Sequence, residues 1–491
     1  MDLANVKKTK ILMSGLMCFA LSACSFLLPS NSESSESSTS FSFSDNPNNV
    51  GDYRQTKMKY SYQDYMDNNY YSNMDSMPTS GTVNLLVIPV QLSGTTFPDG
   101  TLERLEKAYF GTPEETGWHS VSSYYHEESK GLLNITGIIS PIYETTYGTS
   151  IKESETTDLV TKAANWYKDN YSSENGKEFD SDGDGYIDGT ILIYSAPNNT
   201  NKNDNLWAYC FWTSKAANKN SPVANTYFWA SYDFMDSSNR ISIDAHTYIH
   251  ELGHVMGLDD YYNYDTNSSY NPAGGFSMQD YNVGEHDPYS KLALGWVDPI
   301  IATGNCTLTI TPGEAVILSP DDLNSNSPFD EYLILDVYSP TGLNKHDSIF
   351  QYEKNGPKGP NAAGIRVWHV NATLMKNYKK SGVVNLTSKI EAGNYYHHAT
   401  SNSTGSTYGS LDASYRAYKL LHLLQAGGTN TYKNGKYFSA SDLWTAGKTF
   451  SMANYANFFV KPGKLDSGAS LSYSFSVDYI NGRDVTLTIT K

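Results

Sequence analysis

Two histidines and a glutamate stand at a spacing that suits hydrolysis by a bound metal ion. The segment HELGHVMGLDD runs from His250 to Asp260. On a helix, His250 and His254 lie one turn apart on the same face, so both imidazoles can reach one ion. Glu251, beside the first histidine, is placed to contact a water on that ion as a general base. The pattern predicts a catalytic zinc site.

The residues after the motif offer a third ligand. Gly257 can adopt the left-handed conformation that ends a helix and turns the chain. Asp260, six residues beyond His254, can then return to the metal as an oxygen ligand, where the metzincin motif usually has histidine. Asp259 is the competing candidate. His246 shares the helix face but lies about 12 Å from His254 along the axis, so we expect it to be structural.

A second pattern typical of metal binding is the segment DSDGDGYID, residues 180–188. It carries carboxylates at positions 1, 3, 5 and 9 of a loop that resembles an EF-hand, with Gly185 at the sharp turn. Position 12 is Ile191 instead of glutamate, so the loop is not a complete EF-hand. We expect a structural calcium site, with a solvated acidic turn as the alternative. The expected ligands are Asp180, Asp182, Asp184, the carbonyl of Tyr186, and Asp188.

The overall charge excludes some partners. The chain of 491 residues has 35 lysines and arginines against 52 aspartates and glutamates, a formal net charge of −17. Such a chain should repel nucleic acid and anionic membrane surfaces, so we expect no nucleic-acid partner. Its length predicts two or three domains, and we expect a monomer.

The N-terminus has the layout of a bacterial export signal. Three lysines precede an apolar stretch, Ile11–Leu21, that is too short to span a bilayer. The stretch ends in LSAC, which resembles a lipobox whose cysteine, Cys24, becomes the lipidated first residue. We expect residues 1–23 to be a lipoprotein signal peptide and the lipid to anchor the protein to the outer face of a bacterial membrane. A signal cleaved near Ala23, with Cys24 incidental, is the alternative.

The next segments lead into a mixed helix and strand region. Residues 24–50 are rich in serine and predict a flexible tether, and residues 51–79 form a tyrosine-rich segment that either wraps the next domain or acts as a pro-segment. Residues 80–299 alternate strands with helices and predict an α/β or α+β domain, of which we expect the α+β class. The predicted strands are Thr82–Leu92 and Thr190–Tyr194, and the predicted helices are Leu102–Phe110, Ser120–Lys130 and one that Thr157 caps.

The pattern changes after Pro299. Short alternating segments separated by turn residues predict a β-sandwich-like domain over residues 300–491. These segments are Cys306–Ile310, Tyr332–Val337, Gly364–Val370, Tyr418–Leu424, Leu471–Val477 and Val485–Ile489. Of the cysteines in the body of the chain, Cys210 and Cys306 either form one disulfide or stay free.

Several segments together resemble one family of enzymes. HELGHVMGLDDYY is similar to the zinc segment of the M6 family of bacterial metallopeptidases, typified by immune inhibitor A, although that family usually has proline where this chain has Asp259. The resemblance covers roughly residues 80–440. The other segments that carry it are SVSSYYHEESKGLLNITG, GGFSMQDYN, HDPYSKLALGWVDP, EYLILDVYS and GIRVWHV.

The resemblance implies an activity and roles for further residues. It implies a metzincin-like catalytic domain that cleaves peptide bonds in protein or peptide substrates, with Met278 as a structural floor beneath the zinc ion. Tyr281 is a candidate to assist the oxyanion, although packing or surface exposure is the preferred interpretation. A similar acidic loop in the family supports the calcium site at residues 180–188.

Two other functions compete with this interpretation. One is a surface adhesin or binding lipoprotein whose zinc site is structural or relict, and the other is a zinc hydrolase that acts on a non-peptide bond. Glu251 argues against the first, because structural zinc needs no general base. The metzincin-like extension to Asp260 argues against the second.

Overall fold

A computed structural model describes residues 46, 48–68, 75–198, 206–236, 241–264, 268–352, 356–376, 385–403 and 416–491. The predicted signal peptide, Cys24 and nearly all of the tether lie outside the described residues, so their roles stay predictions. Among the described residues, no helix is both long and apolar enough to cross a bilayer. Residues Asn46–Lys491 form one compact unit.

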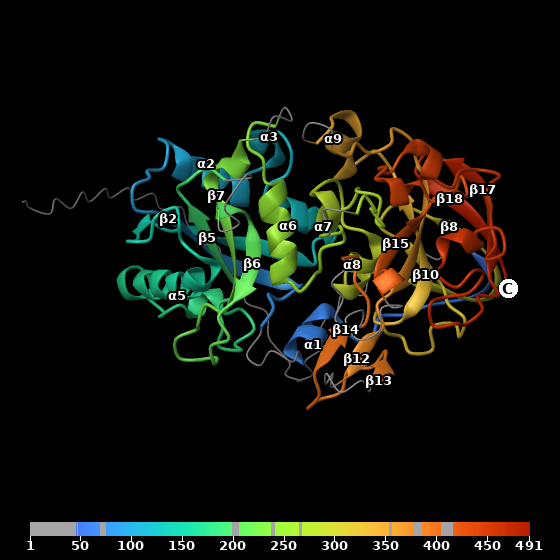
Figure 1. Ribbon diagram of the computed structural model, residues 1–491, viewed down its shortest axis with the longest axis horizontal. Helices are drawn as coiled ribbons and strands as arrows, with labels where there is room; N and C mark the ends of the chain where they lie inside the picture. Colours follow the sequence, from blue (N-terminus) through green and yellow to red (C-terminus); the bar gives the residue numbers. More distant parts are fainter. Residues whose placement is uncertain are drawn as a thin grey trace, which may run out of the picture. The chain divides into compact units, whose positions relative to one another are not determined.

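The first half of this unit is built on a six-stranded sheet in the order β3-β2-β5-β7-β6, with β4 paired to β2 (Figure 1). All pairs are parallel except β6 with β7, so β6 is an antiparallel edge strand. The strands are β2 (Gly81–Gln91), β3 (Leu133–Ile139), β4 (Tyr143–Glu144), β5 (Gly189–Tyr194), β6 (Tyr209–Trp212) and β7 (Thr226–Ser231). The predicted strands Thr82–Leu92 and Thr190–Tyr194 correspond to β2 and β5.

Helices cover both faces of this sheet, which explains why its central strands are apolar along their whole length. Alternate residues of β2 belong to different clusters: Leu86 and Ile88 pack with α5, whereas Leu85 and Val87 pack with α2, α4 and α6. The helices of this half are α2 (Thr101–Phe110), α3 (Pro113–Thr116), α4 (Val121–Glu128), α5 (Glu153–Asn170) and α6 (His246–Val255). The prediction that Thr157 caps a helix is wrong, because Glu155 accepts the backbone N–H of Lys152 and starts α5 at Glu153.

The second half is dominated by a nine-stranded sheet in the order β15-β11-β10-β9-β8-β18-β17-β16, with β1 paired to β8. A smaller sheet has the order β13-β12-β14. The mixture of helices and sheets agrees with the α+β prediction, whereas the sandwich-like packing of the second half stays a prediction. The strands of the large sheet are β1 (Val50–Gln55), β8 (Ile300–Ile310), β9 (Ala315–Leu318), β10 (Glu331–Tyr338), β11 (Gly364–Asn371), β15 (Leu421–Leu424), β16 (Thr449–Phe450), β17 (Ser474–Asn481) and β18 (Asp484–Thr490). Those of the small sheet are β12 (Leu374–Lys376), β13 (Asn385–Thr387) and β14 (Tyr396–His398).

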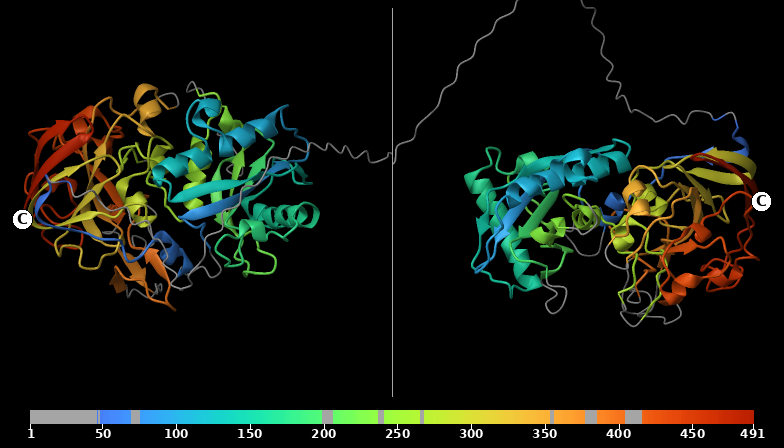
Figure 2. Two further views of the ribbon diagram at one scale, coloured as in Figure 1. Left: turned by 180° about the vertical axis from the view of Figure 1, so that it is seen from behind. Right: turned by 90° about the horizontal axis from the view of Figure 1, so that it is seen from above.

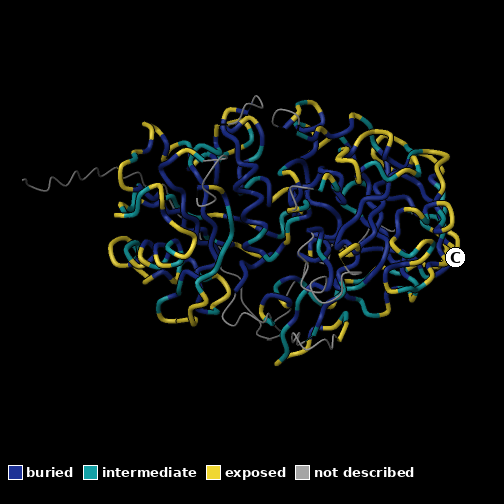
Figure 3. Tube along the Cα trace, viewed as in Figure 1, coloured by how far each residue is buried: buried dark blue, intermediate teal, exposed yellow. Residues whose placement is uncertain are grey.

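The two large sheets lie at opposite ends of the compact unit, with short helices between them (Figure 2). These are α7 (Met278–Tyr281) and α8 (Pro288–Ala293), and the second half also carries α9 (Asn344–Ile349). One hydrophobic cluster contains residues of both halves, from Val83 and Tyr248 to Ile334 and Trp368. The central strands and α6 are buried along the trace (Figure 3).

The segment before the first sheet packs against the rest of the unit. Its helix α1 (Tyr62–Asp67) buries Tyr62 and Met66. The Tyr62 hydroxyl lies 3.2 Å from both the Tyr289 hydroxyl and His398 Nε2. A Cβ on Gly257 would stand 2.9 Å from Met66 Cγ, so α1 approaches the end of α6 closely. The segment thus wraps the later residues, whether or not it is later removed.

Candidate metal centre

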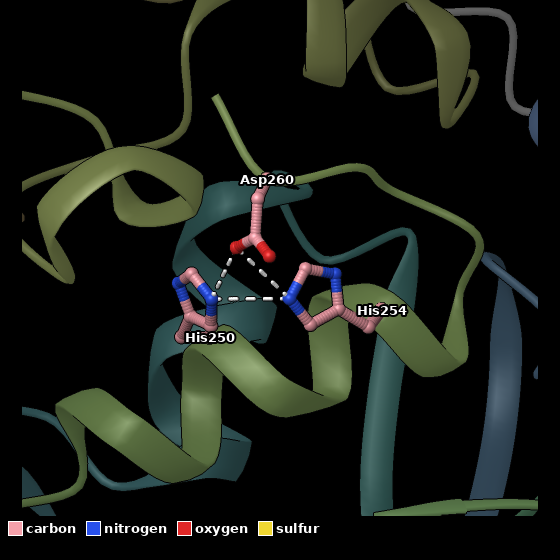
Figure 4. Close-up of side chains that lie close together, drawn as sticks. All are labelled: His250, His254 and Asp260. Atoms are coloured by element: carbon pink, nitrogen blue, oxygen red, sulfur yellow. Dashed lines mark hydrogen bonds and ion pairs between the residues drawn. The ribbon is translucent and has the colours of Figure 1, made fainter. Parts of the chain in front are cut away.

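Helix α6 and the turn after it bring two histidines and an aspartate to one point (Figure 4). His250 Nε2 and His254 Nε2 are 3.1 Å apart, and both lie close to Asp260 Oδ1, at 3.0 and 3.3 Å. Metal–ligand bonds of about 2.0–2.2 Å in a tetrahedral site place ligand atoms roughly 3.4 Å from one another. The three atoms therefore stand nearly where zinc ligands would stand.

The other ring nitrogens fix which atoms face the cluster. His250 Nδ1 donates to the Met278 carbonyl and His254 Nδ1 donates to the Leu258 carbonyl, each at 2.7 Å. Because a carbonyl only accepts, both Nδ1 atoms carry hydrogen, and the Nε2 lone pairs are left for a metal. Two lone pairs and a carboxylate oxygen that converge in this way repel one another unless a cation lies between them. The residues present therefore fit a bound zinc ion.

The chain turns at Gly257, which has φ +101°, and this turn separates the two aspartate candidates. The Asp260 carboxylate lies with the histidines, and its second oxygen accepts a hydrogen bond from the Tyr264 hydroxyl. The Asp259 side chain is 54% exposed and lies 3.9 Å from His398 Nε2. Of the two, only Asp260 shares a candidate metal cluster with the histidines.

Electrostatics at the cluster favour positive charge. Burial alone would lower the pKa of His254, but the Asp260 carboxylate beside it raises that pKa to about 10. In turn, burial opposes ionisation of Asp260, yet the two histidines hold its pKa well below the usual range. A proton or a metal ion would offset the repulsion between these ligand atoms. A divalent ion would bind all three of them at once.

Glu251 lies beside the cluster but does not belong to it. Its side chain is buried and borders the open cleft. Within the described residues, its Oε2 has no hydrogen-bond partner. Burial raises the pKa of Glu251, while the positive charge of His254 and His250 acts in the opposite direction. A carboxylate with a free oxygen and a raised pKa is suited to accept a proton and then return it.

Residues of α7 contact the zinc-binding motif and hold His250 in place. Met278 is fully buried and its carbonyl orients His250, whereas Tyr281 is 38% exposed and borders the cleft. Gln279, which the sequence did not reveal as important, donates from Nε2 to the His250 carbonyl at 3.2 Å. A Cβ on Gly253 would stand 2.3 Å from Gln279 Oε1, so the glycine inside the motif allows this close approach.

A cleft of about 940 Å³ opens over the cluster. One wall is the edge strand β6, which within the described residues pairs only with β7. Residues of β6 thus line the cleft, and one edge of this strand has no ladder partner among the described residues. Aromatic side chains dominate the lining, among them Tyr65, Trp207, Tyr209, Trp212, Tyr262 and Tyr437.

His246 does not join the cluster and instead forms a buried ion pair network. Its Nδ1 lies 2.6 Å from Asp244 Oδ1 and its Nε2 lies 3.3 Å from Asp347 Oδ2. The ring stacks on Trp118 with 3.8 Å between centroids. Burial would lower the pKa of His246, but the two aspartates raise it to about 10. The network joins α6 to α9 of the second half.

The acidic loop brings three of its four expected carboxylate ligands together. Carboxylate oxygens of Asp180, Asp182 and Asp188 lie within 4.8 Å of one another. Asp184 is not in this group, and its carboxylate accepts the Tyr186 backbone N–H at 2.7 Å. The Tyr186 carbonyl stays a predicted ligand. Burial raises the pKa of Asp188 to about 7. The loop gathers negative charge, and the described residues place no lysine or arginine in hydrogen-bond contact with these carboxylates.

The two cysteines of the body are apart. Cys210 is on β6 and Cys306 is on β8, in different sheets, and both are free thiols. Of the two possibilities that the sequence left open, the structure shows the free cysteines.

Comparison with known proteins adds little to this geometry. No family model matches the chain, and no curated protein matches it. Among solved structures, metalloproteinase-II from Bacteroides fragilis matches with 12% identity and a TM-score of 0.20, over 40% of this chain and 51% of that chain. The chain thus matches about half the length of that protein. A match at this TM-score establishes neither the fold nor the function of the chain.

Proposed function

We propose that this protein is a zinc-dependent endopeptidase that cleaves protein substrates outside the cell. One observation carries the proposal: three metal-ligand atoms converge beside a buried Glu251 oxygen that has no partner among the described residues, at the floor of an open cleft. Structural zinc sites close all four positions with protein ligands. Three ligands, a cleft and a free carboxylate are instead what hydrolysis requires.

The roles of the residues follow from their positions. His250, His254 and Asp260 hold the zinc ion, which when bound would activate a water and polarise the scissile carbonyl. Glu251 accepts a proton from the water at its free oxygen and passes that proton to the leaving amine. The carbonyls of Met278 and Leu258 keep both imidazoles in the tautomer that binds metal.

The shape of the cleft favours a polypeptide substrate. An extended peptide placed along β6 would form main-chain hydrogen bonds with the free edge of that strand. The aromatic lining would bury large apolar side chains of the substrate. An adhesin with a relict zinc site would need neither the free Glu251 oxygen nor an open cleft above the metal.

Replacement of Glu251 tests the proposal. We expect Glu251→Gln to keep its zinc, since Glu251 is not a ligand, and to lose about 10²–10⁴-fold in the rate of casein or quenched-peptide cleavage. Glu103→Gln on the exposed face of α2 is the matched control, and it should retain full activity. Zinc content by mass spectrometry and cleavage rates are measured on the same samples. Unchanged proteolysis by Glu251→Gln would remove the basis of the assignment.

The proposal also includes a calcium site and a lipid anchor. Calcium bound at Asp180, Asp182 and Asp188 would stabilise the loop that leads into β5. A lipid on Cys24 would hold the monomeric enzyme at the outer face of the membrane. Neither the calcium ion nor the lipid takes part in the cleavage step.

A further inference from the structure

A third group of metal-type side chains lies in the large sheet, away from the catalytic motif in sequence. Glu331 is on β10, His369 is on β11, and Asp466 is in the chain before β17. Their ligand atoms lie within 4.8 Å of one another. Glu331 pairs with Asn371 across the two strands, and His369 is two residues from Asn371, so Glu331 and His369 share one face of the sheet.

The group is buried and only partly satisfied. Glu331, His369 and Asp466 are 6%, 3% and 3% exposed. Glu331 is well supplied, since it accepts the backbone N–H groups of Asp466 and Ser467 at 2.5 and 2.9 Å and lies 2.9 Å from His369 Nε2. In contrast, Asp466 Oδ1 has no hydrogen-bond partner among the described residues. A buried carboxylate oxygen left without a partner is costly, which points to a missing ligand.

A purely structural ion pair explains only part of this arrangement. A protonated His369 would neutralise Glu331, but it would leave the Asp466 carboxylate beside a second carboxylate. Asn371 donates to the other oxygen, Asp466 Oδ2, at 3.2 Å. Lys461 donates to the backbone carbonyl of Asp466, so this lysine is not bound to the free oxygen. What is missing at the free oxygen is therefore a cation or a donor.

We propose that Glu331, His369 and Asp466 form a second metal site, which binds a divalent first-row ion such as zinc. One imidazole and two carboxylates suit zinc or manganese, and the histidine disfavours calcium. A cavity of about 330 Å³ borders His369 and Asp466 and leaves room for water ligands, and its lining also includes Arg416, Lys419 and Lys433. The ion would fasten the chain around Asp466 to β10 and β11. This site is independent of the proposed peptidase activity.

Zinc counting in a variant without the α6 site tests the proposal. The full chain carrying His250→Ala and His254→Ala is stripped with a chelator, kept in excess calcium to fill the acidic loop, and titrated with zinc. We expect one bound equivalent of zinc and a rise in melting temperature. Addition of Asp466→Asn should abolish both effects, because the amide keeps the volume but loses the anionic ligand. Asp478→Asn, at an exposed position of β17, is the matched control and should keep the zinc.

The outcomes separate the alternatives. If the variant lacking both histidines binds no zinc, or if Asp466→Asn leaves its zinc binding unchanged, the second site does not exist. Should Asp466→Asn fail to fold, the unmutated chain decides the matter: two zinc equivalents under the same conditions support the site, and one equivalent overturns it. Cleavage is not measured here, so failure of this site leaves the Glu251→Gln test unaffected.

Discussion

The α6 cluster and the acidic loop gather metal-type ligands in two different ways. At α6, backbone carbonyls from beyond the helix hold the ligands: those of Met278 and Leu258 orient the imidazoles. In the acidic loop, the carboxylates accept hydrogen bonds from the loop's own backbone, for example Gly185 N–H to Asp180 and Ser181 N–H to Asp188. Contacts with residues beyond α6 therefore orient the first set of ligands, whereas backbone groups of the loop itself orient the second.

This difference predicts how each site depends on its ion. Because α6 is buried and its ligands are already aligned, loss of the ion should abolish chemistry while the fold persists. The acidic loop holds like charges together by short-range bonds alone, so its ion should contribute to stability and not to catalysis. Four experiments test the α6 region and the acidic loop, in order of decreasing expected effect.

The sharpest test of the α6 site compares its two adjacent aspartates. Asp260→Ala removes an oxygen ligand, and we expect loss of stoichiometric zinc and a fall in cleavage of at least about 10³-fold, since Lewis-acid stabilisation is worth several kcal/mol. Asp259→Ala should retain zinc, because this carboxylate is not among the ligand atoms that converge with His250 and His254. Equal zinc loss in both variants would contradict the assignment of Asp260.

A second test concerns the support of α6 from the other half of the molecule. Asp347 on α9 accepts the Gly284 backbone N–H at 2.7 Å and lies 3.3 Å from His246 Nε2. Asp347→Asn should lower the free energy of unfolding by about 3 kcal/mol, the lower end of the range for an opened buried ion pair, since Asp244 remains. Urea unfolding measures this loss. Asp158→Asn, in an exposed pair with Lys162, should change stability by less than about 0.5 kcal/mol.

The same network should make the stability of the fold depend on pH. Burial opposes protonation of His246, but the two aspartates raise its pKa from 6.5 to about 10. Folding therefore favours the protonated ring, and this stabilisation is complete below pH 6.5 and is lost as pH rises to about 10. Asp347→Asn lowers the folded-state pKa, so the variant should lose less stability across this window than the unmutated protein. Identical pH profiles would show that the network does not titrate in this way.

How far the sequence predicted these sites depends on how far apart their residues stand in the chain. His250 and His254 were predictable because helical periodicity fixes their relation, and Gly257 marked the turn that returns Asp260. Gln279 and Asp347 were not predictable, because they reach α6 only through tertiary packing. The group at Glu331, His369 and Asp466 had no local signal either, since its three residues come from separate segments.

The same limit applies to the fold. Apolar runs identified β2 and β5, because strands buried on both faces are apolar along their length. No feature of the sequence around residues 50–55 indicated that β1 would pair with β8. This pairing joins residues far apart in the chain, such as Val50 and Thr307. The spacing of the acidic residues also did not show that the Asp184 carboxylate would accept a backbone N–H of its own loop. For this reason it did not predict that Asp184 would lie apart from Asp180, Asp182 and Asp188.

The smallest effect is expected at the acidic loop, and it completes the contrast. An ion bound only to the folded state stabilises it by about 2.7 kcal/mol at 100 times its dissociation constant, which should raise the melting temperature by several degrees. Asp182→Ala should abolish this rise and leave the zinc content and the cleavage rate of the calcium-free protein unchanged, because no hydrogen bond or ion pair between described residues joins the loop carboxylates to His250, His254 or Asp260. Asp169→Ala, exposed on α5, should keep the full calcium response. If calcium instead altered cleavage without altering the melting temperature, the two sites would not divide catalysis and stability as their bonding indicates.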